Sequence, residues 1–279
     1  MSLPSERGKA MEKKPAKTSS YESIVAELFF ARYIPGLKEL PFSREEIVSA
    51  AGKLNVPLPK NLGDVMYSYR YRKPLPKDVI GTQPAGFEWI IEGAGDAKYV
   101  FKLVPFNRII PNPNLFSIKI PDATPEIIGR YALGDEQALL AKVRYNRLID
   151  LFLGATAYSL QNHLRTKVPG IGQIEIDEVY VAVDKHGRQF VVPVQAKGGH
   201  DQHGVVQTSQ DIAWCEQRLP ELICRPISVQ FVTERKIAMF ELLDENGIIK
   251  VADERHYELV PYDCITAEDL STYGKLAKD

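Results

Sequence analysis

The sequence has few cysteines, no long apolar run and almost no excess of charge. Its three cysteines are an odd number without metal-ligand spacing, which excludes a disulfide framework and a cysteine-based zinc site. We therefore expect reduced thiols and a cytoplasmic location. The chain lacks a membrane-spanning run and the apolar core of a signal peptide, so we expect no membrane partner. The net charge of −1 excludes a uniformly basic nucleic-acid-binding protein but leaves room for a locally basic surface.

The composition is otherwise that of a globular protein with two domains. Hydrophobic residues make up 44% and charged residues 25% of the 279 residues, and a typical domain has about 150 residues. Prolines and asparagines are frequent at 106–130, so we place the domain boundary there. We expect a flexible tail at 1–19, a first domain at 20–105, a linker at 106–130 and a second domain at 131–279.

The first domain has the element order of a winged helix. Apolar residues at helical spacing predict helices at 20–34, from Ser43 onward and at about 61–72. Ser43 and Glu46 have the spacing of a capping box, and alternating apolar residues predict a hairpin at 87–104. In a winged helix the third helix enters the major groove of DNA. The alternative is a small helical module without that role.

The region of the third predicted helix combines basic and aromatic side chains. Basic groups neutralise phosphates, and tyrosines contact sugars and base edges, so we expect this region to bind double-stranded DNA. A solvated basic face is the alternative. The residues predicted to bind DNA here are Lys60, Asn61, Tyr67, Arg70 and Arg72. A second basic segment at 140–170 adds Arg144 and Arg165 to the predicted DNA contacts.

The second domain mixes helices and strands. A long helix is predicted at 135–153, followed by a segment at 155–168 that is either helical or extended. Two strongly β-like runs at 174–183 and 189–196 flank a turn at 184–187. The remaining predicted elements are a helix at 206–219 and strands at 227–232 and 237–242. This order indicates an α+β protein.

Polar residues gather at one end of the predicted hairpin. Alternation places Glu175 and Asp177 on one face of the first strand. Gln195 and Lys197 share one face of the second strand. Such groups are costly to bury without a partner, and a hard divalent cation binds oxygen ligands of this kind. A five-residue turn at 184–188 would pair Asp177 with Gln195, whereas a four-residue turn would point Gln195 to the other face.

Asp177, a hairpin of about eighteen residues and then Gln195-Ala196-Lys197 resemble the PD-(D/E)XK nuclease superfamily. The likeness is to restriction-endonuclease-like members and to the variant with a Q-x-K motif, and it covers roughly residues 135–232. It implies a central mixed sheet flanked by helices, dependence on Mg²⁺ with Mn²⁺ as a substitute, and hydrolysis of phosphodiester bonds.

The resemblance also implies a role for each motif residue. Asp177 would bridge the metal, and Gln195 would donate its side-chain oxygen. The carbonyl of Ala196 would be a further oxygen ligand. Lys197 would position or activate the attacking water and stabilise the developing charge.

The sequence departs from the family pattern in two places. Ile176 stands where a proline is usual, and a glutamine replaces the usual glutamate, which removes one negative charge from the metal site. Glu175 or Glu178 can restore that charge, and Glu175 is on the better face. The family often adds a carboxylate from the preceding helix, for which Glu136 and Asp150 are candidates; we favour Glu136.

Two further groups of polar residues have two interpretations each. Gln207, Gln210 and Asp211 share one face of the following helix, which points either at the site or into solvent. His163 lies in a basic stretch, where it either contacts a phosphate or makes a local hydrogen bond.

Together these features predict a Mg²⁺-dependent endodeoxyribonuclease, foremost a type II restriction enzyme that acts as a homodimer on double-stranded DNA. Two alternatives stay open. One is a repair or modification-dependent nuclease whose N-terminal domain senses a damaged or methylated base. The other is a DNA-binding regulator with an inactive nuclease-like domain, since a glutamine replaces an acidic residue.

Overall fold

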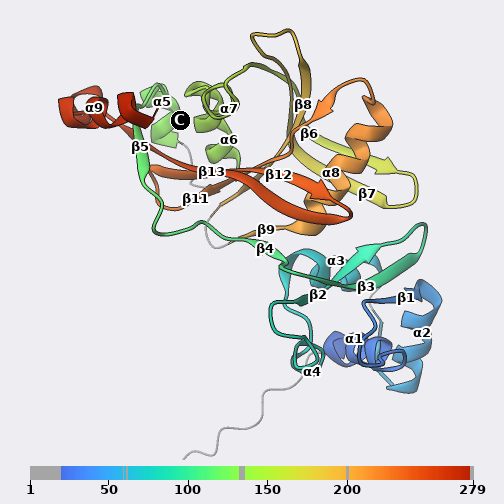
Figure 1. The fold of residues 1–279 in the computed structure, drawn as a ribbon. Coiled ribbons are helices and arrows are strands. Elements are labelled where there is room, and N and C mark those ends of the chain that lie inside the picture. Colours follow the sequence, from blue (N-terminus) through green and yellow to red (C-terminus); the bar gives the residue numbers. More distant parts are fainter. Residues whose placement is uncertain (1–19, 59, 61, 132–135, 199–200, 277–279) are drawn as a thin grey trace, which may run out of the picture.

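The fold is α+β, as predicted, with a small and a large β-sheet (Figure 1). The computed structural model describes residues 20–276 apart from 59, 61, 132–135 and 199–200, and also leaves out the side chains of Ser20, Asp64, Arg72 and Leu276. Within these residues the chain forms a three-stranded antiparallel sheet, an eight-stranded mixed sheet and a short two-stranded antiparallel sheet. The tail predicted at 1–19 lies outside the described residues. No described helix is long and apolar enough to cross a membrane.

The N-terminal part contains the predicted helices and hairpin, one further strand and one further short helix. In chain order its elements are α1 (Ser20–Phe30), β1 (Glu39–Ser43), α2 (Arg44–Lys53), α3 (Gly63–Tyr67), η1 (Ser68–Arg72), α4 (Lys77–Ile80), β2 (Glu88–Gly93) and β3 (Lys98–Val104). The sheet order is β1-β3-β2. The predicted capping box is confirmed, because the backbone N–H of Ser43 donates to Oε2 of Glu46 over 2.8 Å. Helix α3 continues into η1, one turn of π-helix.

The segment predicted as a linker contributes to the large sheet. It holds β4 (Arg108–Ile109), β5 (Ser117–Pro121) and α5 (Glu126–Tyr131). Strand β5 runs parallel to the C-terminal strand β13 (Ile248–Val260) and forms one edge of the sheet. The backbone groups of β5 therefore find partners far away in the sequence, which local composition does not reveal.

The C-terminal part is a twisted mixed sheet with helices on both faces (Figure 1). Its other elements are α6 (Glu136–Tyr145), α7 (Leu148–Leu153), β6 (Thr156–Val168), β7 (Gly172–Val183), β8 (Gln189–Lys197), β9 (His203–Gly204), α8 (Val205–Arg218), β10 (Ile223–Cys224), β11 (Ile227–Phe231), β12 (Lys236–Glu245), η2 (Tyr262–Cys264) and α9 (Ala267–Leu276). The sheet order is β5-β13-β12-β11-β8-β7-β6, with β10 pairing β8. Strand β11 follows α8 and lies parallel to β8.

The single helix predicted at 135–153 is two helices, α6 and α7. Arg147 between them has a left-handed backbone with φ of 50°. The buried side chain of Asn146 stabilises this break, because its amide donates to the carbonyl of Lys142 and its Oδ1 accepts from the N–H of Ala123. Asparagine side chains compete with helical hydrogen bonds in this way. The apolar residues at 135–153 continue across Arg147, so the sequence pattern did not indicate this break.

The two faces of the sheet are packed by different helices. Val192 and Val194 of β8 lie in one core cluster with residues of α6 and α7. Val191 of the same strand lies in another cluster with Trp214 and Cys215 of α8. Strand alternation therefore separates an α6–α7 face from an α8 face. The N-terminal part has its own core around Phe29 and Phe101, built only from residues before Val104.

A third core cluster joins the two parts of the chain. Ile90 of β2 and Val104 of β3 pack with Val205 and Val206 of α8 and with Phe240 of β12. This cluster is apolar and buried, so it fixes the N-terminal part against the α8 face of the large sheet.

Arg144 forms a structural ion pair, which generates a stability prediction. Its guanidinium lies 3.1 Å from Oε1 of Glu178, a carboxylate of β7 with no exposed surface. Arg144→Ala leaves that buried charge without its cation, so we expect a loss of about 3 kcal/mol in the free energy of unfolding. Urea denaturation measures this. The double variant with Glu178→Gln should recover much of the loss; equal stability of Arg144→Ala and wild type would contradict the expectation.

Candidate active site in the cleft between the two parts

The hairpin of β7 and β8 has the register that brings the predicted residues together. Val183 pairs with Gln189, so the turn has five residues, 184–188, and the longer of the two turns considered from the sequence is the correct one. Ladder pairing stops at Glu178 and Val194. Beyond it, Oδ2 of Asp177 accepts a hydrogen bond of 2.8 Å from the backbone N–H of Ala196.

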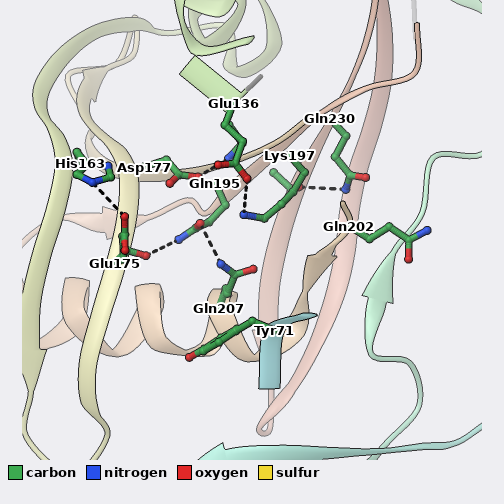
Figure 2. Close-up of polar contacts among 12 residues, drawn as sticks. Tyr71, Glu136, His163, Glu175, Asp177, Gln195, Lys197, Gln202, Gln207 and Gln230 are labelled. Carbon is green, nitrogen blue, oxygen red and sulfur yellow. Dashed lines mark hydrogen bonds and ion pairs between the residues drawn. The ribbon is translucent and has the colours of Figure 1, made fainter. Parts of the chain in front are cut away.

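Glu136, Asp177 and Lys197 converge at this end of the hairpin from three elements (Figure 2). Nζ of Lys197 lies 3.4 Å from Oε1 of Glu136, at the start of α6. Burial raises the pKa of Asp177, while the nearby ammonium of Lys197 opposes that rise. A carboxylate whose charge is disfavoured by burial, close to a second carboxylate, is a suitable ligand for a cation.

The structure separates the two candidates for the upstream carboxylate. Glu136 lies at the cleft beside Lys197. Asp150 forms an ion pair with Arg147 and accepts a hydrogen bond from the backbone N–H of Ala157. Asp150 thus has a structural role at the start of β6, and Glu136, favoured from the sequence, is the one brought to the site.

Gln195 is held by a network on the α8 face. Its Nε2 donates to the carbonyl of Glu175 over 2.9 Å and to Oδ2 of Asp211 over 3.1 Å. Nε2 of Gln207 approaches Oε1 of Gln195 at 3.4 Å (Figure 2). With both amide hydrogens engaged and one lone pair of Oε1 facing Gln207, the second lone pair of Oε1 remains for a ligand.

The sequence left open whether the helix face with Asp211 points at the site or into solvent. In the structure Asp211 is buried beside Gln195. Its side chain is 2% exposed, and burial raises the pKa of this carboxyl well above its usual range. The hydrogen bond from Gln195 acts in the opposite direction. The face shared by Gln207, Gln210 and Asp211 therefore points toward the site, where Gln207 and Gln210 line the cleft.

Glu175 and His163 form the exposed side of the site. Nε2 of His163 lies 3.2 Å from Oε1 of Glu175, and Nε of Arg165 lies 3.2 Å from Oε2 of the same carboxylate. Ligand atoms of His163, Glu175 and Asp177 all lie within 4.8 Å of one another. Glu175 can thus supply negative charge next to Asp177, and His163 makes the local contact that was one of its two interpretations.

The site opens into a cleft of about 710 Å³ between the two parts of the chain. One wall carries Glu136, Glu175, Asp177 and Lys197 of the large-sheet part. The opposite wall belongs to the N-terminal part and is formed by α3, η1 and the turn between β2 and β3. The lining side chains of that wall include Arg44, Met66, Tyr67, Arg70, Tyr71, Lys98 and Tyr99.

The residues predicted to bind DNA have different positions. Tyr67, Arg70 and Arg165 line the cleft. Lys60 is exposed and is not part of the cleft lining. Arg144 is outside the lining too, in its ion pair with buried Glu178. Asn61 and the side chain of Arg72 lie outside the described part of the chain.

Comparison with known proteins gives no match, whether to family models, to curated proteins or to solved structures. The likeness to PD-(D/E)XK nucleases therefore stays a prediction that rests on the motif residues and on their arrangement in space.

Asp211 gives a testable dependence of stability on pH. Its pKa is raised in the folded chain, so the unfolded chain releases this proton at a lower pH than the folded chain does. The free energy of unfolding of wild type therefore falls as pH rises from about 4 through the folded pKa. Asp211→Asn cannot ionise. Its free energy of unfolding relative to wild type should therefore increase from pH 4 to pH 8, as measured by urea denaturation at several pH values. Asp78→Asn, at an exposed position of α4, is the matched control. A difference that is flat with pH for Asp211→Asn would contradict the assignment.

Proposed function

We propose that the protein is a Mg²⁺-dependent endodeoxyribonuclease that hydrolyses phosphodiester bonds, with Mn²⁺ as a substitute metal. The observation that carries this proposal is the convergence of Glu136, Asp177 and Lys197 at the end of one hairpin, beside the amide of Gln195. Two carboxylates, an amide oxygen and an ammonium group on one cleft fit the chemistry of phosphate hydrolysis. Apart from the two-residue strands β9 and β10, the element order α6-α7, β6, β7, β8, α8, β11 supports the resemblance drawn from the sequence.

The donor set fits a hard divalent cation. Asp177, Glu136 and Oε1 of Gln195 offer oxygen atoms at the cleft, and Glu175 adds negative charge nearby. The carbonyl of Ala196 follows Gln195 directly and is the further ligand that the resemblance implies. When bound, such a cation polarises the phosphate and lowers the pKa of a coordinated water.

Lys197 and Asp177 then have separate tasks. Lys197 places a positive charge where negative charge develops on the phosphate, and its contact with Glu136 holds its ammonium group in the cleft. Asp177 is fixed by the N–H of Ala196, so one of its oxygens is oriented before any ligand binds. Arg70 supplies positive charge on the N-terminal wall for a flanking phosphate, whereas the charge of Arg165 is paired with Glu175.

Our first hypothesis for the biological role is a cytoplasmic type II restriction enzyme that acts as a homodimer. Its substrate is double-stranded DNA. The position of α3 and η1 favours a second candidate, a repair or modification-dependent nuclease. These elements form a wall of the cleft that holds Asp177, so a base contacted by them would be examined at the place of cleavage. Cleavage of methylated, unmethylated and branched DNA by the purified protein separates the two.

Lys197→Ala should abolish cleavage and leave DNA affinity nearly unchanged, because the ammonium acts at the scissile phosphate. Cleavage of plasmid DNA with Mg²⁺ and binding of the same DNA with EDTA measure the two effects. Lys185→Ala, in the turn at the far end of the same hairpin, is the matched control and should cut like wild type. Equal rates for Lys197→Ala and wild type would remove Lys197 from the mechanism.

Asp177→Asn should lose metal affinity as well as activity, since the carboxylate supplies charge that holds the cation. Calorimetric titration with Mn²⁺ measures the affinity directly. Asp263→Asn changes an exposed carboxylate far along the sequence, in η2, and should bind Mn²⁺ like wild type. Undiminished Mn²⁺ affinity of Asp177→Asn would show that the metal site lies elsewhere.

A further inference from the structure

The third helix of the N-terminal part faces the candidate active site. Tyr67, Arg70 and Tyr71 of α3 and η1 line the same cleft as Asp177 and Lys197. The hydroxyl of Tyr71 donates to Oε1 of Gln210 on α8 over 3.1 Å. In a winged helix that reads a major groove, this element would instead insert its length into the duplex.

The two walls of the cleft are joined by a buried apolar contact. The apolar cluster around Ile90, Val205 and Phe240 joins them, and the side chain of Tyr71 packs against it. Placing η1 in a major groove would require this cluster to separate and would expose its apolar surface to water. The arrangement therefore favours a ligand that enters the cleft over a duplex that the helix enters.

The N-terminal wall has an aromatic and cationic surface. The ring of Tyr67 is 46% exposed and contacts the ring of Tyr71 at 4.9 Å between centroids. The guanidinium of Arg70 lies 5.0 Å from the centroid of the Tyr71 ring. Arg70 has no ion-pair partner among the described residues, and its Nε and Nη2 lack a hydrogen-bond partner there. These two atoms are buried, so Arg70 acts on the cleft through its uncompensated charge, while the exposed ring of Tyr67 offers a surface on which a nucleobase stacks.

The size of the cleft agrees with this chemistry. Its volume of about 710 Å³ lies within the range of about 300–1,000 Å³ in which proteins hold small ligands and nucleotides. A nucleotide in the cleft meets Tyr67 on one wall and the group of Asp177, Glu136 and Lys197 on the other. Enzymes that act on a nucleotide outside the base stack use a pocket with aromatic side chains in this way.

We propose that the cleft binds an unpaired nucleotide of DNA, with its base stacked on Tyr67 and its phosphate directed to Asp177 and Lys197. This inference deepens the proposed function and rests on it for the fate of the phosphate. The unpaired nucleotide has two possible sources, a single strand or a nucleotide that is extruded from a duplex. The positive charge of Arg70 on the N-terminal wall attracts the adjoining phosphate.

Fluorescence of 2-aminopurine in EDTA tests the binding without catalysis. The full chain is titrated into three 2-aminopurine oligonucleotides: a single strand, a fully paired duplex, and a duplex in which the fluorescent base lies opposite an abasic site. Stacking quenches this base. We expect tighter binding and stronger quenching for the single strand or the abasic duplex than for the paired duplex. The oligonucleotide that gives the larger effect identifies the source.

Variants of Tyr67 assign the stacking. Tyr67→Ala should weaken binding of the unpaired nucleotide about 5-fold to 100-fold, the effect of losing one base–aromatic stack, and should abolish the quenching. Tyr67→Phe keeps the ring and should bind within about 2-fold of wild type, because a phenyl ring also stacks. Tyr262→Ala, at a tyrosine that is 82% exposed and absent from the cleft lining, is the matched control.

The outcomes separate this inference from the proposed function. Preference for the paired duplex, or wild-type binding by Tyr67→Ala, overturns the inference even if the protein cuts DNA. Preference for an unpaired nucleotide with loss in Tyr67→Ala supports the inference. In that case, failure to cut any of the three oligonucleotides with Mg²⁺ or Mn²⁺ would overturn only the nuclease activity.

Discussion

The candidate site depends on the register of one hairpin, and that register is set at the other end of the hairpin. Asp184 accepts hydrogen bonds from the backbone N–H groups of His186 and Arg188, and its carboxylate also pairs with the Arg188 guanidinium. Gly187 takes a left-handed conformation with φ of 79°. The turn is thereby fixed at five residues. A slip by one residue would move every side chain of one strand to the opposite face and would separate Asp177 from Ala196.

A second constraint ties this hairpin to the rest of the molecule through α8. Gln195 bonds Asp211, and Gln210 in the same helix bonds Tyr71 of the N-terminal part. The polar network therefore runs from the motif, across one helix, to the wall that faces it. Buried polar groups that satisfy one another specify a single arrangement more sharply than apolar contacts do. The cleft and the motif are positioned by the same helix.

Local patterns predicted much of the fold and of the site. The hairpin, the helix at α8 and the capping box at Ser43 follow from alternation, helical period and side-chain chemistry within a few residues. The sequence favoured Glu136 over Asp150, but both lie in one predicted apolar helix, and the structure supplies the reason. Glu136 lies at the cleft beside Lys197, whereas Asp150 pairs with Arg147.

What the sequence did not reveal depends on distant partners. Strand β13 was not predicted, because its surface residues alternate weakly and its stability comes from pairing with β12 and β5. The juxtaposition of η1 with Asp177 requires the apolar cluster that joins β2, α8 and β12. Side chains in that cluster come from elements far apart in the sequence, and no local pattern shows that they meet.

The edge strand β5 determines where the chain can be divided between the two parts. The chain leaves the N-terminal part after β3 and runs to the far edge of the large sheet, where residues 117–121 form β5 and pair with β13. A fragment that starts at 106 retains this edge, whereas one that starts at 131 exposes the hydrogen-bonding groups of β13. An unpaired strand of that length is a template for association with other chains. The connecting segment thus covers residues 256–260 of β13 and leaves the shorter β5 as the edge strand there, where Pro121 has no N–H to offer a further strand.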